Sequence, residues 1–175
     1  MCADNLTTPY GHRVVIGQRA VHDDLVAPFS GEEYVCLVWA ADNTFDEAAR
    51  MRIVGALIDS GCRYVVCGGV DCEQWHDDAD VAFSKLEVCS NADVPFVMTT
   101  WHHNESIEDV VFFATCCTNF DGHDFKCLLV LVVGQESARL GCLARISRGF
   151  VLQQAHKMGS AQEFDGPASG KGSGR

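Results

Sequence analysis

The sequence predicts an α/β fold of three layers, built on a mostly parallel sheet of four or five strands. Four short runs of apolar and β-branched residues alternate with segments in which apolar residues recur at helical spacing. The connections between the runs are roughly twenty residues long, which suits crossovers between parallel strands and is too long for hairpins. Right-handed crossovers would place alternate helices on either face of the sheet.

The first β/α unit begins with a predicted strand at 34–40. Thr44 and Glu47 then match a capping box, which predicts a helix that starts at Thr44 and ends near Ser60. The second strand is predicted at 63–67, where β-branched residues and tyrosine gather between glycines.

The later units follow the same pattern. Asp71 is placed to cap a helix, and the third strand is predicted at 94–100. Ser106 has the position of an N-cap for the next helix. The fourth strand, at 126–133, is an almost unbroken apolar run, which is typical of a strand covered on both faces.

The ends of the chain complete the predicted fold. Residues 13–17 are expected to form an additional edge strand, and 138–156 a final helix. The interpretation is a single domain over 1–158, with a repeat-free core at about 34–157 and a disordered Gly/Ser-rich tail at 159–175. The strand order is expected to be flavodoxin-like or Rossmann-like, and we favour the flavodoxin-like order.

The charge is unevenly distributed along the chain. The net charge is −11, and the segment from Asp71 to Asp124 holds twelve acidic residues against one basic residue, Lys85. This balance excludes a sequence-independent grip on nucleic acid, which needs clustered lysine and arginine. An acidic middle attracts cations or basic partners, but we favour the simpler explanation, a solvated helix face that aids solubility.

The ten cysteines do not form a disulfide or zinc pattern, because no pair has the C-x-x-C spacing. Cys36, Cys67 and Cys127 lie inside apolar runs, where a thiol behaves as a small hydrophobic group. Reduced cysteines, the lack of a secretory signal and the lack of a long apolar run predict a cytoplasmic protein without membrane association.

Chemistry-bearing residues gather where the predicted strands end. Trp39 and Trp101 close strands, and Trp75 lies in the first turn of a helix, each near histidine or carboxylate side chains. Because ligands of open α/β sheets bind outside the carboxyl ends of the strands, this edge is the predicted site. The candidate ligand-binding residues are Trp75, His76, Trp101, His102, Gly68, Gly69 and Asp42.

Each candidate also has a structural explanation. Asp71 suits a helix cap, and Trp39 suits packing at the rim of the core. For acid–base catalysis the candidates are His76 or His102, with Asp71 or Glu105 to orient the imidazole. The same four residues, joined by Cys72, contain metal-ligand side chains, but their intervals match no established pattern, and we predict no metal site. Cys72 at a helix N-terminus is also a candidate nucleophile beside His76.

The segments Gly68-Gly-Val-Asp-Cys-Glu-Gln-Trp-His76 and Met98-Thr-Thr-Trp-His102 resemble the signature of a small bacterial α/β domain family with no assigned function. The resemblance covers about 34–135 and implies a bacterial cytosolic domain, but it assigns no activity to the chain. The aromatic and imidazole residues in the predicted loops, without a complete catalytic signature, lead us to expect a ligand- or partner-binding regulatory module, for a small molecule or a protein. A small hydrolase or transferase and a structural partner subunit are the alternatives. No cofactor and no oligomeric state is predicted.

Overall fold

One mixed sheet forms the centre of the molecule in the computed structural model, which describes residues 4–19, 28–29, 31–89, 95–120 and 122–162. Its six strands lie in the order β1-β2-β6-β3-β4-β5, and only the pairing of β1 with β2 is antiparallel. The predicted α/β class with a mostly parallel sheet is therefore confirmed, with more strands than expected. The strands are β1 (Asp4–Thr7), β2 (Arg13–Arg19), β3 (Tyr34–Ala40), β4 (Cys62–Gly69), β5 (Met98–His102) and β6 (Cys127–Val133).

The strand order follows the Rossmann pattern and not the flavodoxin-like pattern that we favoured. Counted from β3, four consecutive strands lie as 3-2-1-4 across the sheet, with β6 on the other side of β3 from β4. A flavodoxin-like order would place the first strand between the second and the third. β2 is also not an edge strand, because it pairs with β6 on one side and with the additional strand β1 on the other.

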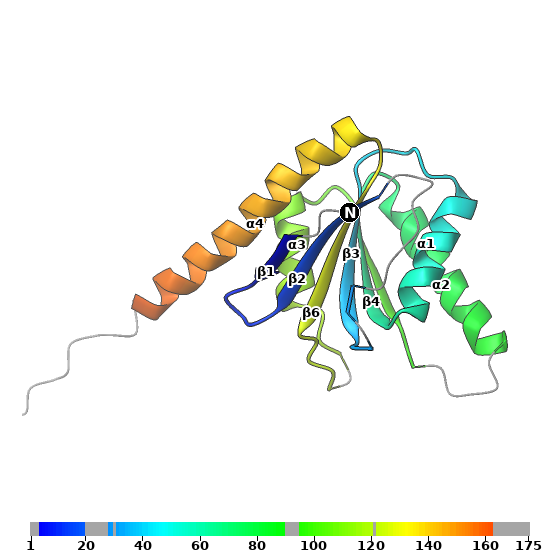
Figure 1. Ribbon diagram of the computed structural model, residues 1–175, viewed down its shortest axis with the longest axis horizontal. Helices are drawn as coiled ribbons and strands as arrows, with labels where there is room; N and C mark the ends of the chain where they lie inside the picture. The colour runs from blue at the N-terminus through cyan, green and yellow to red at the C-terminus, as the bar shows by residue number, and fades with distance from the viewer. Residues whose placement is uncertain (1–3, 20–27, 30, 90–94, 121, 163–175) are drawn as a thin grey trace, which may run out of the picture.

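The four helices of the described residues cover the two faces of the sheet, two on each face (Figure 1). Core contacts place α1 (Glu47–Asp59) and α2 (Cys72–Cys89) on one face, and α3 (Ile107–Cys116) and α4 (Glu136–Gln162) on the other. The prediction that successive helices alternate between the two faces is wrong, because α1 and α2 share one face and α3 and α4 share the other. The chain moves from β3 through β4 to β5 in one direction, and the crossover through α3 then returns it to the far side of β3.

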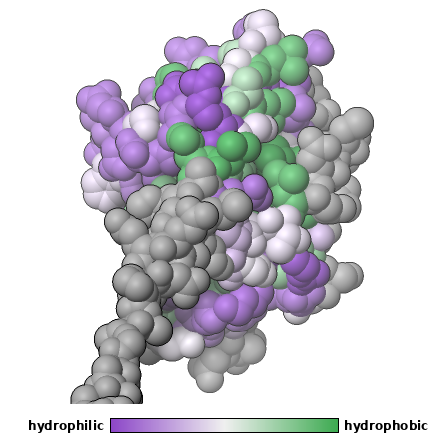
Figure 2. Space-filling view, turned by 90° about the vertical axis from the view of Figure 1, so that its left-hand side faces the viewer, coloured by the Kyte–Doolittle hydropathy of each residue, from purple (hydrophilic) through white to green (hydrophobic). Residues whose placement is uncertain are grey.

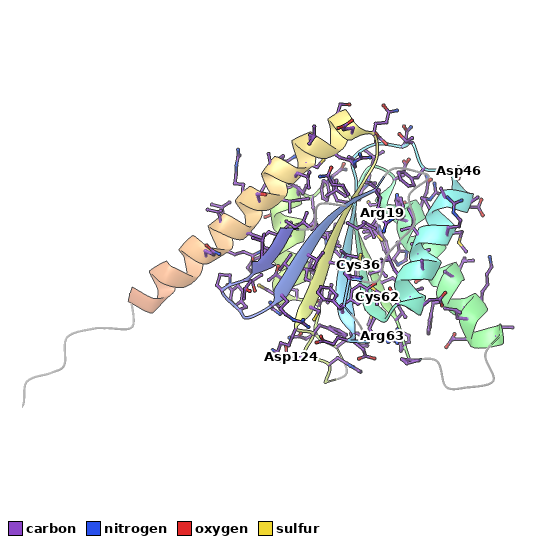
Figure 3. The ribbon with its side chains drawn as sticks, viewed as in Figure 1. Arg19, Cys36, Asp46, Cys62, Arg63 and Asp124 are labelled. Atoms are coloured by element: carbon purple, nitrogen blue, oxygen red, sulfur yellow. The ribbon has the colours of Figure 1, made fainter. Side chains whose placement is uncertain are left out.

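Alternation along the strands divides the core in two. On β3, Cys36 and Val38 face α1 and α2, whereas Val35 and Leu37 face α3 and α4. Figure 3 shows Cys36 and Cys62 inside the molecule, on strands in the middle of the sheet. Burial raises the pKa of Cys62 to about 12, so this thiol stays protonated. The eight cysteines whose side chains the structure describes are free thiols.

The helix starts confirm one predicted cap and correct another. Ser106 caps α3 by accepting a hydrogen bond from the backbone N–H of Asp109. α1, however, is capped by Asp46, which accepts from the backbone N–H of Ala49 at 2.8 Å, and not by Thr44. Thr44 instead donates to Asp42, so the capping-box spacing of Thr44 and Glu47 was misleading.

Two other element boundaries in the structure differ from the predicted ones. β5 starts at Met98, four residues later than the predicted strand, and 90–94 lie outside the described residues. α4 continues through Gly159 to Gln162, into the segment that we expected to be tail, and the remainder of that tail lies outside the described residues. Within the described part of the chain, no helix combines the length and the apolar character needed to cross a membrane.

Candidate functional site

The parallel strands bring four loops to one edge of the sheet, as predicted. β3, β4, β5 and β6 run in the same direction, so the segments that follow them all leave from their carboxyl ends. In a sheet of this order, ligands bind where neighbouring strands send their helices to opposite faces. Here that point lies between β3 and β6, because α1 follows β3 on one face and α4 follows β6 on the other.

Asp42 occupies this switch point. Its carboxylate accepts hydrogen bonds from the backbone N–H of Gln135 at 2.7 Å and from the backbone N–H of Thr44 at 3.0 Å. Gln135 directly precedes α4, so Asp42 holds the place that an anionic ligand takes at a helix N-terminus. A Cβ on Gly134, which has a φ of +137°, would meet the carboxylate at 3.1 Å.

The electrostatics of Asp42 fit this structural part. Burial alone would raise the pKa of Asp42, but the hydrogen bonds from Thr44 and Gln135 outweigh it and lower the pKa. Arg139 of α4 also lowers this pKa, and its Nη1 donates to the carbonyl oxygens of Arg19 and Gly134. Asp42 therefore links the loops after β3 and β6. This structural role accounts for an aspartate at the switch point, and no ligand is needed to explain it.

Gly68 and Gly69 also have steric explanations. A Cβ on Gly68 would lie 2.7 Å from two ring carbons of Trp39, so the glycine makes room for the indole. A Cβ on Gly69, where φ is +85°, would lie 2.1 Å from the carbonyl oxygen of Ala40. Trp39 itself is buried among the core side chains that face α3 and α4, in agreement with the predicted packing at the rim of the core.

Trp75 lies in the core and not in a loop site. Its side chain is 2% exposed, and its ring centroid is 5.7 Å from that of Phe45, between α2 and the start of α1. Trp75 packs with the apolar side chains of α1 and α2, in the part of the core on that face of the sheet. A ligand at the surface has no access to a ring placed there, so Trp75 is removed from the candidate site.

His76 and Trp101 do come together, as the adjacent parallel strands β4 and β5 require. The two ring centroids are 4.5 Å apart at an interplanar angle of 58°. The His76 side chain is 14% exposed, whereas Trp101 is 49% exposed, so the indole partly covers the imidazole. This pair lies where α2 packs against the edge strand β5.

Carboxylates flank the His76–Trp101 pair. Asp77 Oδ1 is 3.1 Å from His76 Nδ1, and Asp80 Oδ2 is 3.7 Å from His76 Nε2. Asp80 also accepts a hydrogen bond of 2.6 Å from the hydroxyl of Thr99 on β5. Both carboxylates keep more than half of their side-chain surface exposed, so they remain open to a partner.

His102 lies on the opposite face of β5, because consecutive strand residues point to opposite faces. It is 7% exposed, and its ring centroid is 4.4 Å from that of Phe113 on α3. Its Nδ1 is 3.1 Å from Glu105 Oε2, but the two atoms do not form a hydrogen bond. His102 and Glu105 therefore form a pair of their own, separate from His76.

Asp71 lies directly before α2, and Cys72 is the first residue of that helix. Asp71 has a φ of +53°, unlike the extended backbone of an ordinary capping residue. Cys72 is 1% exposed, and burial raises its pKa despite the backbone N–H groups of His102 and Glu73 nearby. A buried protonated thiol is a poor nucleophile, so the Cys72–His76 hypothesis loses its basis. Among the described side chains, no three ligand-type residues are grouped closely enough to hold a metal ion.

The sequence reasoning missed four residues at this edge. Asp77 and Asp80 lie beside His76, and the four-residue spacing of His76 and Asp80 on a helix was the signal available. Arg139 was missed because it lies beyond the fourth strand, at the switch point. Arg19 is a buried arginine at the end of β2, and Figure 3 places it at the carboxyl end of the sheet.

The protein is a mostly parallel three-layer α/β domain in which β3 to β6 have the Rossmann strand order. At its switch point, the carboxylate of Asp42 accepts a hydrogen bond from the residue that precedes α4. The family model described as a domain of unknown function, DUF7684, matches residues 18–149, about three quarters of the chain. The chain belongs to this family. No curated protein matches the sequence.

Proposed function

We propose that the protein is a binding module whose partner contacts the surface formed by His76 and Trp101. The observation that carries the proposal is the half-exposed indole of Trp101, held 4.5 Å from the imidazole of His76. Large, rigid aromatic side chains of this kind are the usual anchors of protein interfaces. The closed switch point supports this choice, because Asp42 already fills the position where such folds bind small anions.

The carboxylates beside this pair favour a positively charged partner. Asp77 and Asp80 are both largely exposed next to His76. A lysine or arginine side chain can lay its aliphatic stem on the indole of Trp101 and bring its charge to these carboxylates. An anionic ligand would meet repulsion at the same place.

A titration of small cationic ligands tests this proposal. Spermidine and short arginine-bearing peptides are screened by thermal shift, and hits are titrated by calorimetry against the wild type and the variants Trp101→Ala and His76→Ala. We expect the loss of the anchor to weaken binding about thirtyfold. Phe112→Ala is the matched control, since Phe112 on α3 is an aromatic side chain of similar exposure, 45%. Equal affinity of the wild type and the Trp101→Ala variant would remove the proposed site.

A second candidate function is supported by the pair of His102 and Glu105. The carboxylate of Glu105 lies 3.1 Å from Nδ1, close enough that a small rotation would make the hydrogen bond that orients an imidazole for acid–base catalysis. The other nitrogen, Nε2, is 3.4 Å from the hydroxyl of Thr100. A screen for hydrolysis of ester and nucleotide substrates tests this alternative. Turnover that His102→Gln abolishes and His76→Ala leaves intact would favour the enzyme over the binding module.

A further inference from the structure

We infer that the partner is an extended, basic peptide segment that adds itself as a strand beside β5. This inference rests on the proposed function and names the class of partner. β5 is the last strand in the sheet order, and among the residues that the structure describes no strand pairs with its outer side. The backbone N–H and C=O groups of an edge strand are a template for a further strand.

The side chains along β5 fit such a partner on the α2 side. Glu73, Asp77, Asp80 and Glu87 follow one another at intervals of three, four or seven residues, so they form one stripe along α2. The bond from Thr99 to Asp80 fixes this acidic stripe alongside β5. Alternate side chains of an added strand would therefore face the acidic stripe and the indole of Trp101.

Charge selects a basic peptide over a second copy of the chain. Pairing two β5 edges would bring together the acidic stripes of two α2 helices, and these like charges would repel each other. The net charge of −11 adds to this repulsion. A peptide with lysine or arginine at every second position places its charges against the acidic stripe and its remaining side chains on the other face of the sheet.

The length of β5 sets the size of the partner. Its five residues extend about 17 Å, which matches a peptide core of about five to seven residues. On the other face of β5, the peptide would lie near His102 and Phe113, whose ring centroids are 4.4 Å apart. β-branched residues at the alternate positions suit this apolar surface.

The probe is a fluorescein-labelled peptide of seven residues with alternating lysine and valine, titrated into the full chain by fluorescence anisotropy at low salt. Trp101→Ala and Asp80→Asn should each weaken binding about tenfold or more. The matched controls are Phe112→Ala for the aromatic change and Asp59→Asn for the charge change. Asp59 is exposed at the end of α1, at the amino edge of the sheet, and both controls should bind like the wild type.

Two N-methylated forms of the probe test strand addition itself. One is methylated on the backbone nitrogens of the lysines and the other on the backbone nitrogens of the valines. Alternate backbone N–H groups of a strand point to the same edge, so only one of the two sets faces β5. We expect one form to lose binding about tenfold or more and the other to bind like the parent. If both forms bind like the parent, or both lose binding equally, the peptide does not add as a strand.

The remaining outcomes separate this inference from the proposed function. If methylation has no effect but Trp101→Ala still weakens binding, the strand is wrong and the site stands. If the parent peptide binds the wild type and the Trp101→Ala variant equally, both proposals fail. No binding of the parent peptide, or a chain that sediments as a dimer which the Trp101→Ala variant does not form, overturns the basic peptide as partner.

Discussion

The link that Asp42 makes across the switch point has a measurable energetic consequence. Asp42→Ala removes acceptors for the backbone N–H groups of Gln135 and Thr44 and for the Thr44 hydroxyl. The site is only partly buried, so each hydrogen bond contributes about 0.5–1 kcal/mol, near the low end of the measured range. The free energy of unfolding should fall by about 1.5–3 kcal/mol, which lowers Tm by roughly 3–12 °C for a chain of this length.

Thermal and urea unfolding of Asp42→Ala beside Asp59→Ala measures this effect, because Asp59 is an exposed carboxylate at the far edge of the sheet. The pKa of Asp42 is lowered in the folded state, so its contribution is present above the ordinary pKa near 3.8 and disappears as the pH falls through the folded value. The difference between wild type and variant should thus shrink below about pH 4. Equal stability of the two variants at pH 7 would refute the structural part assigned to Asp42.

The same substitution should open an anion site. Without Asp42, the N–H of Gln135 at the start of α4 is free to bind an anion. Sulfate should therefore stabilise Asp42→Ala more than it stabilises the wild type, measured as the shift of Tm at constant ionic strength. An identical shift for both proteins would show that Asp42 does not take the place of an anion.

Other substitutions test the packing of the two faces. Gly68→Ala brings a Cβ to 2.7 Å from the Trp39 ring and should lower the free energy of unfolding by about 1–3 kcal/mol in urea, whereas Gly55→Ala in α1, with open space around it, should not destabilise the protein. Leu129→Ala, at a side chain only 3% exposed, should cost about 2–5 kcal/mol in the same assay by leaving a cavity. Ser106→Ala removes the cap of α3 and should cost about 0.5–2 kcal/mol, followed by thermal unfolding. An unchanged midpoint for Gly68→Ala, Leu129→Ala or Ser106→Ala would contradict, respectively, the close contact with Trp39, the core packing or the helix cap described above.

Local patterns were enough to predict most of the fold. The apolar runs at 34–40 and 126–133 correspond to β3 and β6, and Ser106 caps α3 as its spacing indicated. The strand order was not predictable, because a run of apolar residues contains no information on which neighbour it pairs with. The unexpected strand Asp4–Thr7 is only four residues long, too short for an alternation to stand out.

The edge of the sheet was predictable, but the exact contacts at it were not. The end of each strand located the candidate residues, and the meeting of His76 with Trp101 follows from parallel neighbours. Which candidate residues lie at the surface and which lie in the core depends on the direction of each side chain. Trp75 and His76 differ by one helical position, about 100°, which sends one ring into the core and the other to the rim.

The three indole N–H signals in a nitrogen–proton NMR spectrum test the central claim most directly. Trp39 and Trp75 are buried, whereas Trp101 is half-exposed, so each tryptophan reports on a different place in the fold. On addition of the alternating lysine–valine peptide, the signal that Trp101→Phe removes should shift, and the other two should stay in place. A titration that leaves the Trp101 signal unchanged, or moves only those of Trp39 and Trp75, would contradict a binding surface at His76 and Trp101.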